Sequence, residues 1–236
     1  MNQTKIKLSK RLNTVASFLP KGTIFADIGS DHGYLPCYVC LHDPTARAIA
    51  GEVNKGPYQR AVKTVRSFQL EKRIDVRLGN GLAILQPGEV SEVVIAGMGG
   101  PLIRTILEDG EDQLLHVERI ITQPNVDARG VRHWLTRNGY FITQETIVEE
   151  NGHYYEIIVA DKQADKQQFK LSEKKLLFGP KLLERKGNDF RRKWRHQYKK
   201  HCRVVEQMKR ARSMPKEKID QLKTEMEWIR EVLGDV

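Results

Sequence analysis

The sequence predicts an α/β fold, a largely parallel β-sheet with helices on both faces, followed by a region made only of helices. Two features of the 236-residue chain carry this prediction. Through residue 160, short β-branched runs alternate with helical patterns, which is typical of parallel strands joined by helices. After Asp161 the β-branched runs stop, and long helical patterns take their place. We therefore predict two domains, residues 1–161 and residues 162–236.

The first domain should open with a helix, because apolar residues from Leu8 to Leu19 fall on one helical face. Further helices are expected at Tyr34–His42, Pro57–Phe68, Leu102–Glu111 and Ala128–Asn138. The predicted strands are TIFADIG, ARAIAGEV, RIDVRLG, SEVVIAGM, ERIITQP, YFITQETIV and HYYEIIVA. Only EENG separates the last two, and so short a connection requires a hairpin. The sheet should therefore end in an antiparallel strand.

The second domain should begin after a polar linker at Asp161–Gln168, with a helix capped by Ser172 and interrupted at Gly179-Pro180. Two long helices should follow, joined by a turn at Ser213–Pro215. Their apolar residues repeat at alternating spacings of three and four, which predicts an antiparallel coiled coil. These residues are Phe190, Trp194, Tyr198, Cys202, Val205 and Met208 in one helix, and Ile219, Leu222, Met226, Ile229 and Leu233 in the other.

Positive charge is concentrated in the second domain. The chain has a net charge of +10, yet residues 1–160 hold 18 basic and 18 acidic side chains, whereas residues 161–236 hold 22 and 12. A patch this one-sided favours a polyanionic partner such as RNA, since a helix that only needs solubility mixes both signs. A solvated helix face is the competing interpretation. The candidate RNA-binding residues of the patch are Arg191, Arg192, Lys193, Arg195, Lys199, Lys200 and Arg203.

Composition argues against membrane and metal-binding classes. No apolar stretch approaches the roughly 20 residues that cross a bilayer, and MNQTKIKLSK lacks the core of a signal peptide. We therefore expect a cytoplasmic protein. Cys37 and Cys40 have CxxC spacing, but no second ligand pair accompanies them. Buried core thiols on a helix are expected, and no metal.

A glycine-rich loop follows the first strand, in FADIGSDHGYLP. The dinucleotide fingerprint G-x-G-x-x-G fails here at its second and third glycine. The loop matches better the acidic-x-Gly-x-Gly-x-Gly pattern of S-adenosylmethionine (SAM) enzymes, with Asp31 in place of the middle glycine. Carboxylates and backbone N–H groups suit the ammonium and carboxylate of methionine. A plain strand–turn–helix connection is the alternative. The candidate cofactor-binding residues of the loop are Asp27, Gly29, Ser30 and Gly33.

Four further strand ends carry polar or glycine residues, and ligands of open α/β sheets bind outside these ends. Glu52 ends the second strand, where an acid can accept both ribose hydroxyls, although a solvated strand end would look the same. Asn80 and Gly81 follow the third strand and are candidates for the adenine site. The fourth strand ends in glycines that leave room for a flat or reactive group, and Gly97 and Met98 are candidate cofactor-binding residues there. The fifth ends with Gln123 and Asn125, which either pair with a base edge or form a plain turn.

The motifs DIGSDHGYLP, GEVNKGP, GNGL, AGMGG, TQPN and GHYYE, followed by a basic coiled-coil tail, resemble the bacterial tRNA adenine-N1 methyltransferases that act on adenine 22. The resemblance covers essentially the whole chain. It implies a class I SAM-dependent, Rossmann-like fold and tRNA as the substrate. It also implies that Asp27, Gly29 and Glu52 contact methionine and ribose, and that Asn80 lies near the adenine. One motif departs from the wider amino-methyltransferase pattern: AGMGG lacks the Asp/Asn-Pro-Pro-aromatic clamp, so base stacking must come from elsewhere.

The chemistry expected at adenine N1 requires little from the protein. N1 has an in-plane lone pair and can attack the methyl group without first losing a proton, so alignment is the main task, worth roughly 7–11 kcal/mol. Asp31 is the candidate to stabilise the positive charge of the product or to bind the methionine ammonium, and His32 to position either group. Tyr154 and Tyr155 point to opposite faces of one strand, so at most one stacks on the base. Tyr154 is the candidate.

Other classes of protein remain open from the sequence. An RNA-binding protein with a non-catalytic Rossmann-like domain would explain the basic helices and leave the loop as scaffold. A methyltransferase for another RNA base, a small molecule or a protein would explain the loop, and the last two leave the basic helices unexplained. A DNA adenine-N6 enzyme should show the missing proline clamp. A monomer is expected.

Overall fold

The computed structural model describes residues 6–163, 170–210 and 216–234, and it shows a seven-stranded sheet of order β3-β2-β1-β4-β5-β7-β6. β1 to β5 are parallel, whereas β7 runs antiparallel to both β5 and β6. The strands are β1 (Ile24–Ile28), β2 (Arg47–Glu52), β3 (Ile74–Leu78), β4 (Glu92–Gly99), β5 (Arg119–Val126), β6 (Tyr140–Glu150) and β7 (His153–Lys162). The predicted α/β class and the antiparallel end of the sheet are confirmed.

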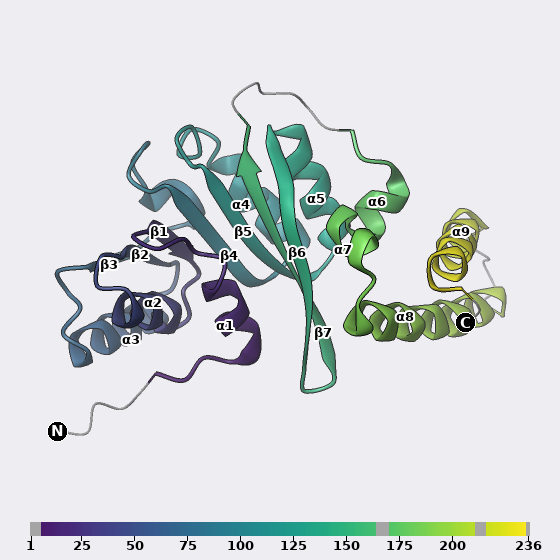
Figure 1. Cartoon of the computed structure of the whole chain (residues 1–236), viewed down its shortest axis with the longest axis horizontal. Helices are drawn as coiled ribbons and strands as arrows, with labels where there is room; N and C mark the ends of the chain where they lie inside the picture. Colours follow the sequence, from purple (N-terminus) through teal and green to yellow (C-terminus); the bar gives the residue numbers. More distant parts are fainter. Residues whose placement is uncertain (1–5, 164–169, 211–215, 235–236) are drawn as a thin grey trace.

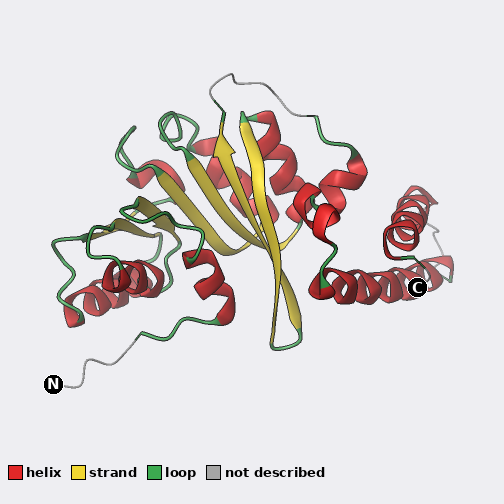
Figure 2. Ribbon diagram, in the orientation of Figure 1, coloured by secondary structure: helices red, strands yellow, loops and turns green. Residues whose placement is uncertain are grey.

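Helices cover both faces of this sheet (Figures 1 and 2). They are α1 (Lys10–Ala16), α2 (Tyr34–His42), α3 (Lys55–Ser67), α4 (Gly100–Asp109) and α5 (Ala128–Arg137), with a 3₁₀ turn, η1 (Gly81–Ile84). Alternation along the strands divides the core into two layers. Phe25 packs with α1, α2 and α3, while its neighbour Ala26 packs with α4 and α5.

Cys37 and Cys40 lie in the layer of α2, as expected of core thiols. Burial raises the pKa of Cys37 to about 12 and that of Cys40 to about 11. Within the described ranges, no three His, Cys, Asp or Glu side chains are arranged to hold a metal ion. None of the helices in those ranges combines the length and apolar character that a bilayer span requires.

Four helices follow the sheet: α6 (Glu173–Phe178), α7 (Pro180–Arg185), α8 (Asn188–Lys209) and α9 (Lys216–Leu233). The predicted cap and interruption are present, because Ser172 Oγ accepts from Lys175 N at 3.3 Å and Gly179 separates α6 from α7. Val205 of α8 packs against Ile219 and Leu222 of α9. The predicted turn at Ser213–Pro215 and most of the linker Asp161–Gln168 lie outside the described residues.

An aromatic cluster joins these helices to the sheet. Phe178, Phe190 and Trp194 are buried together with Ile147 of β6, and Tyr154 of β7 is packed against them. The predicted boundary between residues 161 and 162 stays a prediction, and apolar packing crosses it. Figure 1 shows α6 and α7 beside β6 and α5, with α8 extending away from the sheet.

Candidate functional site

The carboxyl ends of the five parallel strands meet at one edge of the sheet. The strand order reverses between β1 and β4, so the chain connections leave in opposite directions there. Ligands of open α/β sheets bind in the crevice at such a point. Residues that follow β1, β2 and β4 therefore line the place where a ligand is expected.

The loop between β1 and α2 turns sharply at this point. Residues with φ in the left-handed region are Gly29 (70°), Asp31 (44°), His32 (74°) and Gly33 (72°). Such angles are unfavourable for residues with a side chain and cluster at functional sites. The N–H groups of Gly29 and Ser30 both donate to the carbonyl of Gly51, at 2.9 and 3.1 Å. The loop is thereby fixed against the end of β2.

Asp27 is a buried carboxyl group beneath this loop. Its Oδ2 accepts a hydrogen bond from Ser30 Oγ at 2.7 Å. Burial raises the pKa of Asp27 to about 7, opposed by the Ser30 hydrogen bond and helped by the charges of Glu52 and Asp31. The group is therefore only partly ionised at neutral pH, and a nearby cation would favour its charged form.

Glu52 lies beside the same loop and is also buried. Burial raises its pKa, while the backbone N–H groups of His32 and Asp31 lower it. Among the residues that the structure describes, neither its Oε1 nor the buried Nδ1 of His32 has a hydrogen-bond partner. Buried polar atoms without partners are costly, and a bound polar ligand would satisfy them. These residues fit the hydroxyl and ammonium groups of SAM.

Met98 forms the opposite wall, at the end of β4. The Met98 methyl group lies against Gly29, whose φ of 70° is in the left-handed region that favours glycine. The pairing of β4 with β5 shifts register around Met98, and Gly97 has a φ of 78°. Beyond β3, Asn80 is exposed and Gly81 begins η1.

The candidate catalytic residues are not gathered in one place. Asp31 and His32 are neighbours after β1, with Asp31 Oδ1 3.4 Å from His32 Nε2, and the Asp31 side chain is 87% exposed. Tyr154 is on β7, and both β4 and β5 separate it from β1 in the sheet. Tyr154 lies on the side of α8, whereas Tyr155 faces Arg11 of α1. The opposite orientation of the two tyrosines is as predicted.

Gln123 and Asn125 differ in accessibility. Gln123 is fully buried, and its Oε1 accepts from Gly97 N at 3.0 Å and from Arg11 Nη1. Asn125 is exposed at the rim of the site. A direct contact of Gln123 with RNA is therefore not possible in this structure. Sequence reasoning missed Arg11, which lies 112 residues before Gln123 in the chain and looks like an ordinary charge on a short helix.

The basic residues of α8 divide into two groups. Arg192, Arg195, Lys199, Lys200 and Arg203 are exposed, and Arg191 is half-buried. Lys193, predicted with them, is instead turned toward the sheet and forms an ion pair with the buried Glu156 of β7. Lys193 follows the buried Phe190 by three residues, which places it on the packed face of the helix. Lys193 is therefore absent from the exposed basic surface.

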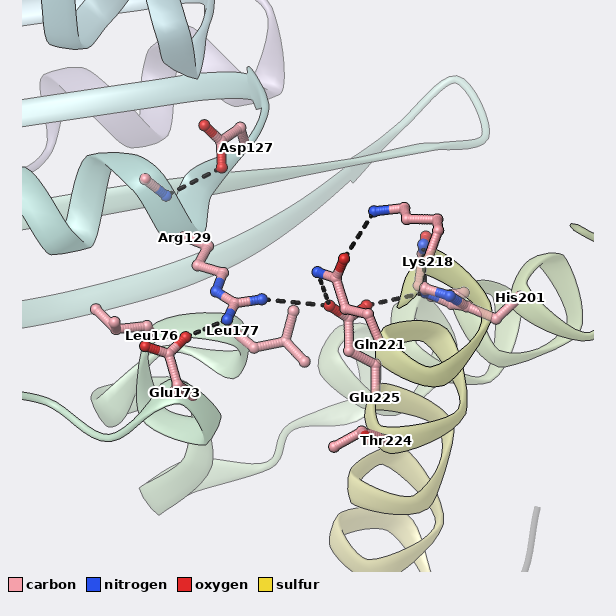
Figure 3. A network of polar contacts seen from close by, with 12 residues as sticks. Asp127, Arg129, Glu173, Leu176, Leu177, His201, Lys218, Gln221, Thr224 and Glu225 are labelled. Atoms are coloured by element: carbon pink, nitrogen blue, oxygen red, sulfur yellow. Dashed lines mark hydrogen bonds and ion pairs between the residues drawn. The ribbon is translucent and has the colours of Figure 1, made fainter. Parts of the chain in front are cut away.

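Polar contacts fix α9 next to the rim of the sheet (Figure 3). Arg129, near the start of α5, pairs with Glu225 of α9 at 3.2 Å and with Glu173 of α6. His201 of α8 lies 3.7 Å from Glu225, and burial lowers its pKa. These contacts leave a cleft of about 550 Å³ between the sheet and the two helices. Its lining includes Asn125 and Tyr154 on one side and His196 and Lys200 on the other.

A sheet of this order, with a glycine loop after β1 and a buried acid after β2, defines a Rossmann-like methyltransferase. The model of the tRNA (adenine(22)-N(1))-methyltransferase family matches residues 25–231. The chain belongs to this family, as the sequence predicts.

Three similar proteins support the assignment of the chain to this family. The tRNA (adenine(22)-N(1))-methyltransferase of Bacillus subtilis (strain 168) is 42% identical over 97% of this chain and 98% of its own. A Streptococcus pneumoniae putative tRNA (m1A22) methyltransferase, solved with S-adenosyl-L-methionine, is 41% identical with a TM-score of 0.87, covering 97% of this chain and 100% of its own. M. capricolum TrmK, solved with S-adenosyl-homocysteine, is 28% identical with a TM-score of 0.83, covering 96% and 97%.

Proposed function

We propose that the chain transfers the methyl group of SAM to N1 of adenine 22 in tRNA. This is the activity of its family, and the predicted enzyme class is confirmed. The structural observation that carries the proposal is the buried Glu52 carboxylate, whose Oε1 lacks a partner beside the strained glycine loop. A non-catalytic RNA-binding domain has no reason to keep such a group at the sheet's ligand-binding edge.

SAM supplies a methyl group attached to a positively charged sulfur. We assign its methionine part to Asp27, Gly29, Ser30 and Gly33, and its ribose to Glu52. Asn80 and Gly81 are assigned to the adenine of the cofactor. Gly97 and Met98, at the end of β4, are assigned to the wall of the cofactor site. The close approach of the Met98 side chain to Gly29 supports a narrow site here.

The target adenine attacks through its N1 lone pair, so the protein aligns it and excludes water. Asp31 is proposed to stabilise the cationic product or the methionine ammonium, with His32 holding its orientation at 3.4 Å. Tyr154 is proposed to stack on the base from the cleft side. Each assignment is a proposal that follows from position and chemistry.

We propose that α8 and α9, the predicted coiled-coil pair, bind tRNA through the exposed basic residues of α8. The cleft beside them reaches from Lys200 to Asn125, so a tRNA bound along α8 would extend to the rim of the methyl-transfer site. The predictions of a monomer and of a cytoplasmic location stay predictions.

Nucleoside mass spectrometry tests the reaction. Unmodified tRNA incubated with the protein and isotope-labelled SAM should yield labelled 1-methyladenosine, and mass spectrometry of ribonuclease fragments should place it at position 22. Label on adenine N6, on cytosine, or on no nucleoside at all would contradict the proposed function.

Replacing Glu52 with glutamine should weaken SAM binding about tenfold or more, because a hydrogen bond to a charged group is worth roughly 1.5–3 kcal/mol. Titration calorimetry of SAM measures the effect. Glu118→Gln is the matched control, since Glu118 is exposed at the opposite end of the sheet. Equal affinities in the two variants would remove Glu52 from the ribose site.

SAM affinity should also depend on pH through Asp27. Its pKa is raised to about 7, so the carboxyl is protonated at lower pH and must lose its proton to bind the methionine ammonium. We therefore expect the dissociation constant to rise about tenfold from pH 8 to pH 6. Calorimetry across this range checks the sign. Asp27→Asn should flatten the dependence, and an unchanged profile in that variant would place the titration elsewhere.

A further inference from the structure

Arg11 is fixed at the edge of the methyl-transfer site by contacts from three elements. Lys10, its neighbour, donates its backbone N–H to Glu150 Oε1 at 2.6 Å and its Nζ to Glu149 O at 3.2 Å, which ties α1 to the end of β6. The Arg11 guanidinium lies 5.1 Å from the centre of the Tyr155 ring on β7. Its Nη1 donates to Gln123 Oε1 on β5.

Two donors together determine the orientation of two amides in series: the Arg11 guanidinium and the backbone N–H of Gly97, which donates to the same Gln123 Oε1 at 3.0 Å. A guanidinium has donors only, so Gln123 must turn its oxygen toward Arg11 and its Nε2 toward Asn125. Asn125 Oδ1 accepts from that Nε2 at 3.0 Å. Asn125 must then turn its Nδ2 to the other side, where it donates to Gly97 O at 2.8 Å. Exchanging the oxygen and nitrogen of either amide would place donor against donor.

Asn125 keeps hydrogen-bonding capacity after these contacts. One N–H of its Nδ2 and one lone pair of its Oδ1 are not used by Gln123 and Gly97. Asn125 is exposed and lines the cleft that leads to α8, whereas Gln123 is fully buried. The rim of the site therefore presents one donor and one acceptor, close together and held in a fixed orientation.

Adenine carries one hydrogen-bond donor and one acceptor, N6–H and N7, on the edge away from N1, and they match those of Asn125. The amide of asparagine pairs in a bidentate manner with adenine N6–H and N7. Recognition through this edge leaves the N1 lone pair free, which a reaction at N1 requires. Recognition through the Watson–Crick edge would occupy the reacting atom.

We propose that Asn125 recognises the N6/N7 edge of the target adenine, and that Arg11 is a positioning residue that orients Asn125 through Gln123. The inference rests on the proposed function and names how its substrate base is recognised. Gln123 acts between the two and does not contact RNA.

The test uses tRNA that carries 7-deazaadenosine at position 22, which lacks the N7 acceptor. With the wild-type protein, kcat/KM should fall about three- to tenfold relative to unmodified tRNA, the value of one hydrogen bond. The Asn125→Ala variant should have a lower kcat/KM on both tRNAs and should no longer distinguish between them. Comparing the ratio of the two substrates between variants cancels any change in the intrinsic reactivity of N1.

Arg11→Met should lose part of this discrimination although Asn125 is intact, since the Gly97 N–H still donates to Gln123, and Arg11→Lys, which keeps a cationic donor, should recover some of the loss. Lys10→Met is the matched control, because it weakens the attachment of α1 but keeps the guanidinium. SAM affinity, measured by calorimetry, should be unchanged in all four variants. An unchanged affinity shows that the SAM site is folded.

The outcomes separate the inference from the proposed function. Failure of the wild-type protein to methylate unmodified tRNA would contradict the proposed function itself. Methylation of both tRNAs at equal rates by an active wild-type protein would overturn only the recognition by Asn125. Discrimination that is undiminished in Arg11→Met, or that falls equally in Lys10→Met, would overturn the positioning role of Arg11.

Discussion

Replacing Arg132 with methionine is expected to lower the free energy of unfolding by about 3–5 kcal/mol, since it leaves buried carboxylates without their main partner. Arg132 is fully buried on α5. Its Nε donates to Glu145 Oε1 of β6 at 2.6 Å, and its Nη2 contacts Glu156 of β7. Its Nη1 donates to the carbonyl oxygens of Leu176 and Leu177 of α6, at 3.1 and 3.3 Å.

The pKa values show how tightly these charges depend on each other. Burial alone would raise the pKa of Glu156, but Arg132 and Lys193 lower this pKa to about 2. Glu156 therefore stabilises the fold above its unfolded pKa of about 4.5, and this contribution is lost as the pH falls toward 2. Without Arg132, the single cation Lys193 faces two carboxylates.

Urea denaturation followed by circular dichroism measures the loss. Arg104→Met is the matched control, because Arg104 pairs with Asp127 at 3.3 Å with both side chains 37% exposed, and such a pair is worth less than about 1 kcal/mol. The double variant Arg132→Met/Glu145→Gln should regain part of the loss by removing one unpaired charge. If Arg132→Met were no less stable than Arg104→Met, the buried network would have no role in stability.

The same network limits where the chain can be divided. Residues after 161 supply Lys193 and the α6 carbonyls to a cluster whose other members precede that residue. A Cβ atom on Gly179 would lie 2.6 Å from Glu145 Oε2, so Gly179, at the break between α6 and α7, lies directly against this cluster. We therefore expect removal of residues 162–236 to destabilise the sheet as well as to remove the basic helices.

Local signals account for the parts of the fold that the sequence predicts. The strand tips, the helix at Tyr34–His42 and the cap at Ser172 are all encoded within a few residues of where they appear. The orientation of Lys193 is not encoded by such local signals, because counting charges treats every lysine of a helix alike. Its direction is set by Glu156, 37 residues earlier in the chain.

The candidate site shows the same limit. Glycines and acids at strand ends are visible in the sequence, since their spacing reflects the turn that they form. The burial of Gln123 and its contact with Arg11 depend on where α1 packs, which no local pattern reports. The sequence therefore predicts a polar contact for Gln123, but not that its partners are Arg11 and Gly97 rather than a base edge.

Neutralising the exposed face of α8 is expected to weaken tRNA binding by on the order of a hundredfold at physiological salt. Each phosphate contact contributes about 0.7–0.9 to the slope of log affinity against log salt, so four losses should reduce that slope by about 3. The residues to replace with glutamine are Arg192, Arg195, Lys199 and Arg203, which are exposed and repeat at spacings of three and four. Fluorescence anisotropy with labelled tRNA at several salt concentrations gives both quantities.

A matched control separates a defined surface from net charge. Lys21, Arg47, Arg66 and Lys72 are also exposed, and they lie toward the amino ends of β1 to β3, away from the cleft. Their replacement by glutamine removes the same charge and should change the salt slope little. Lys193→Met should likewise leave the slope unchanged while lowering stability, because its charge is used by Glu156. Equal losses of slope in the two fourfold variants would mean that tRNA responds to the total charge of the protein, and recognition would then have to be sought at the rim around Asn125 and Tyr154.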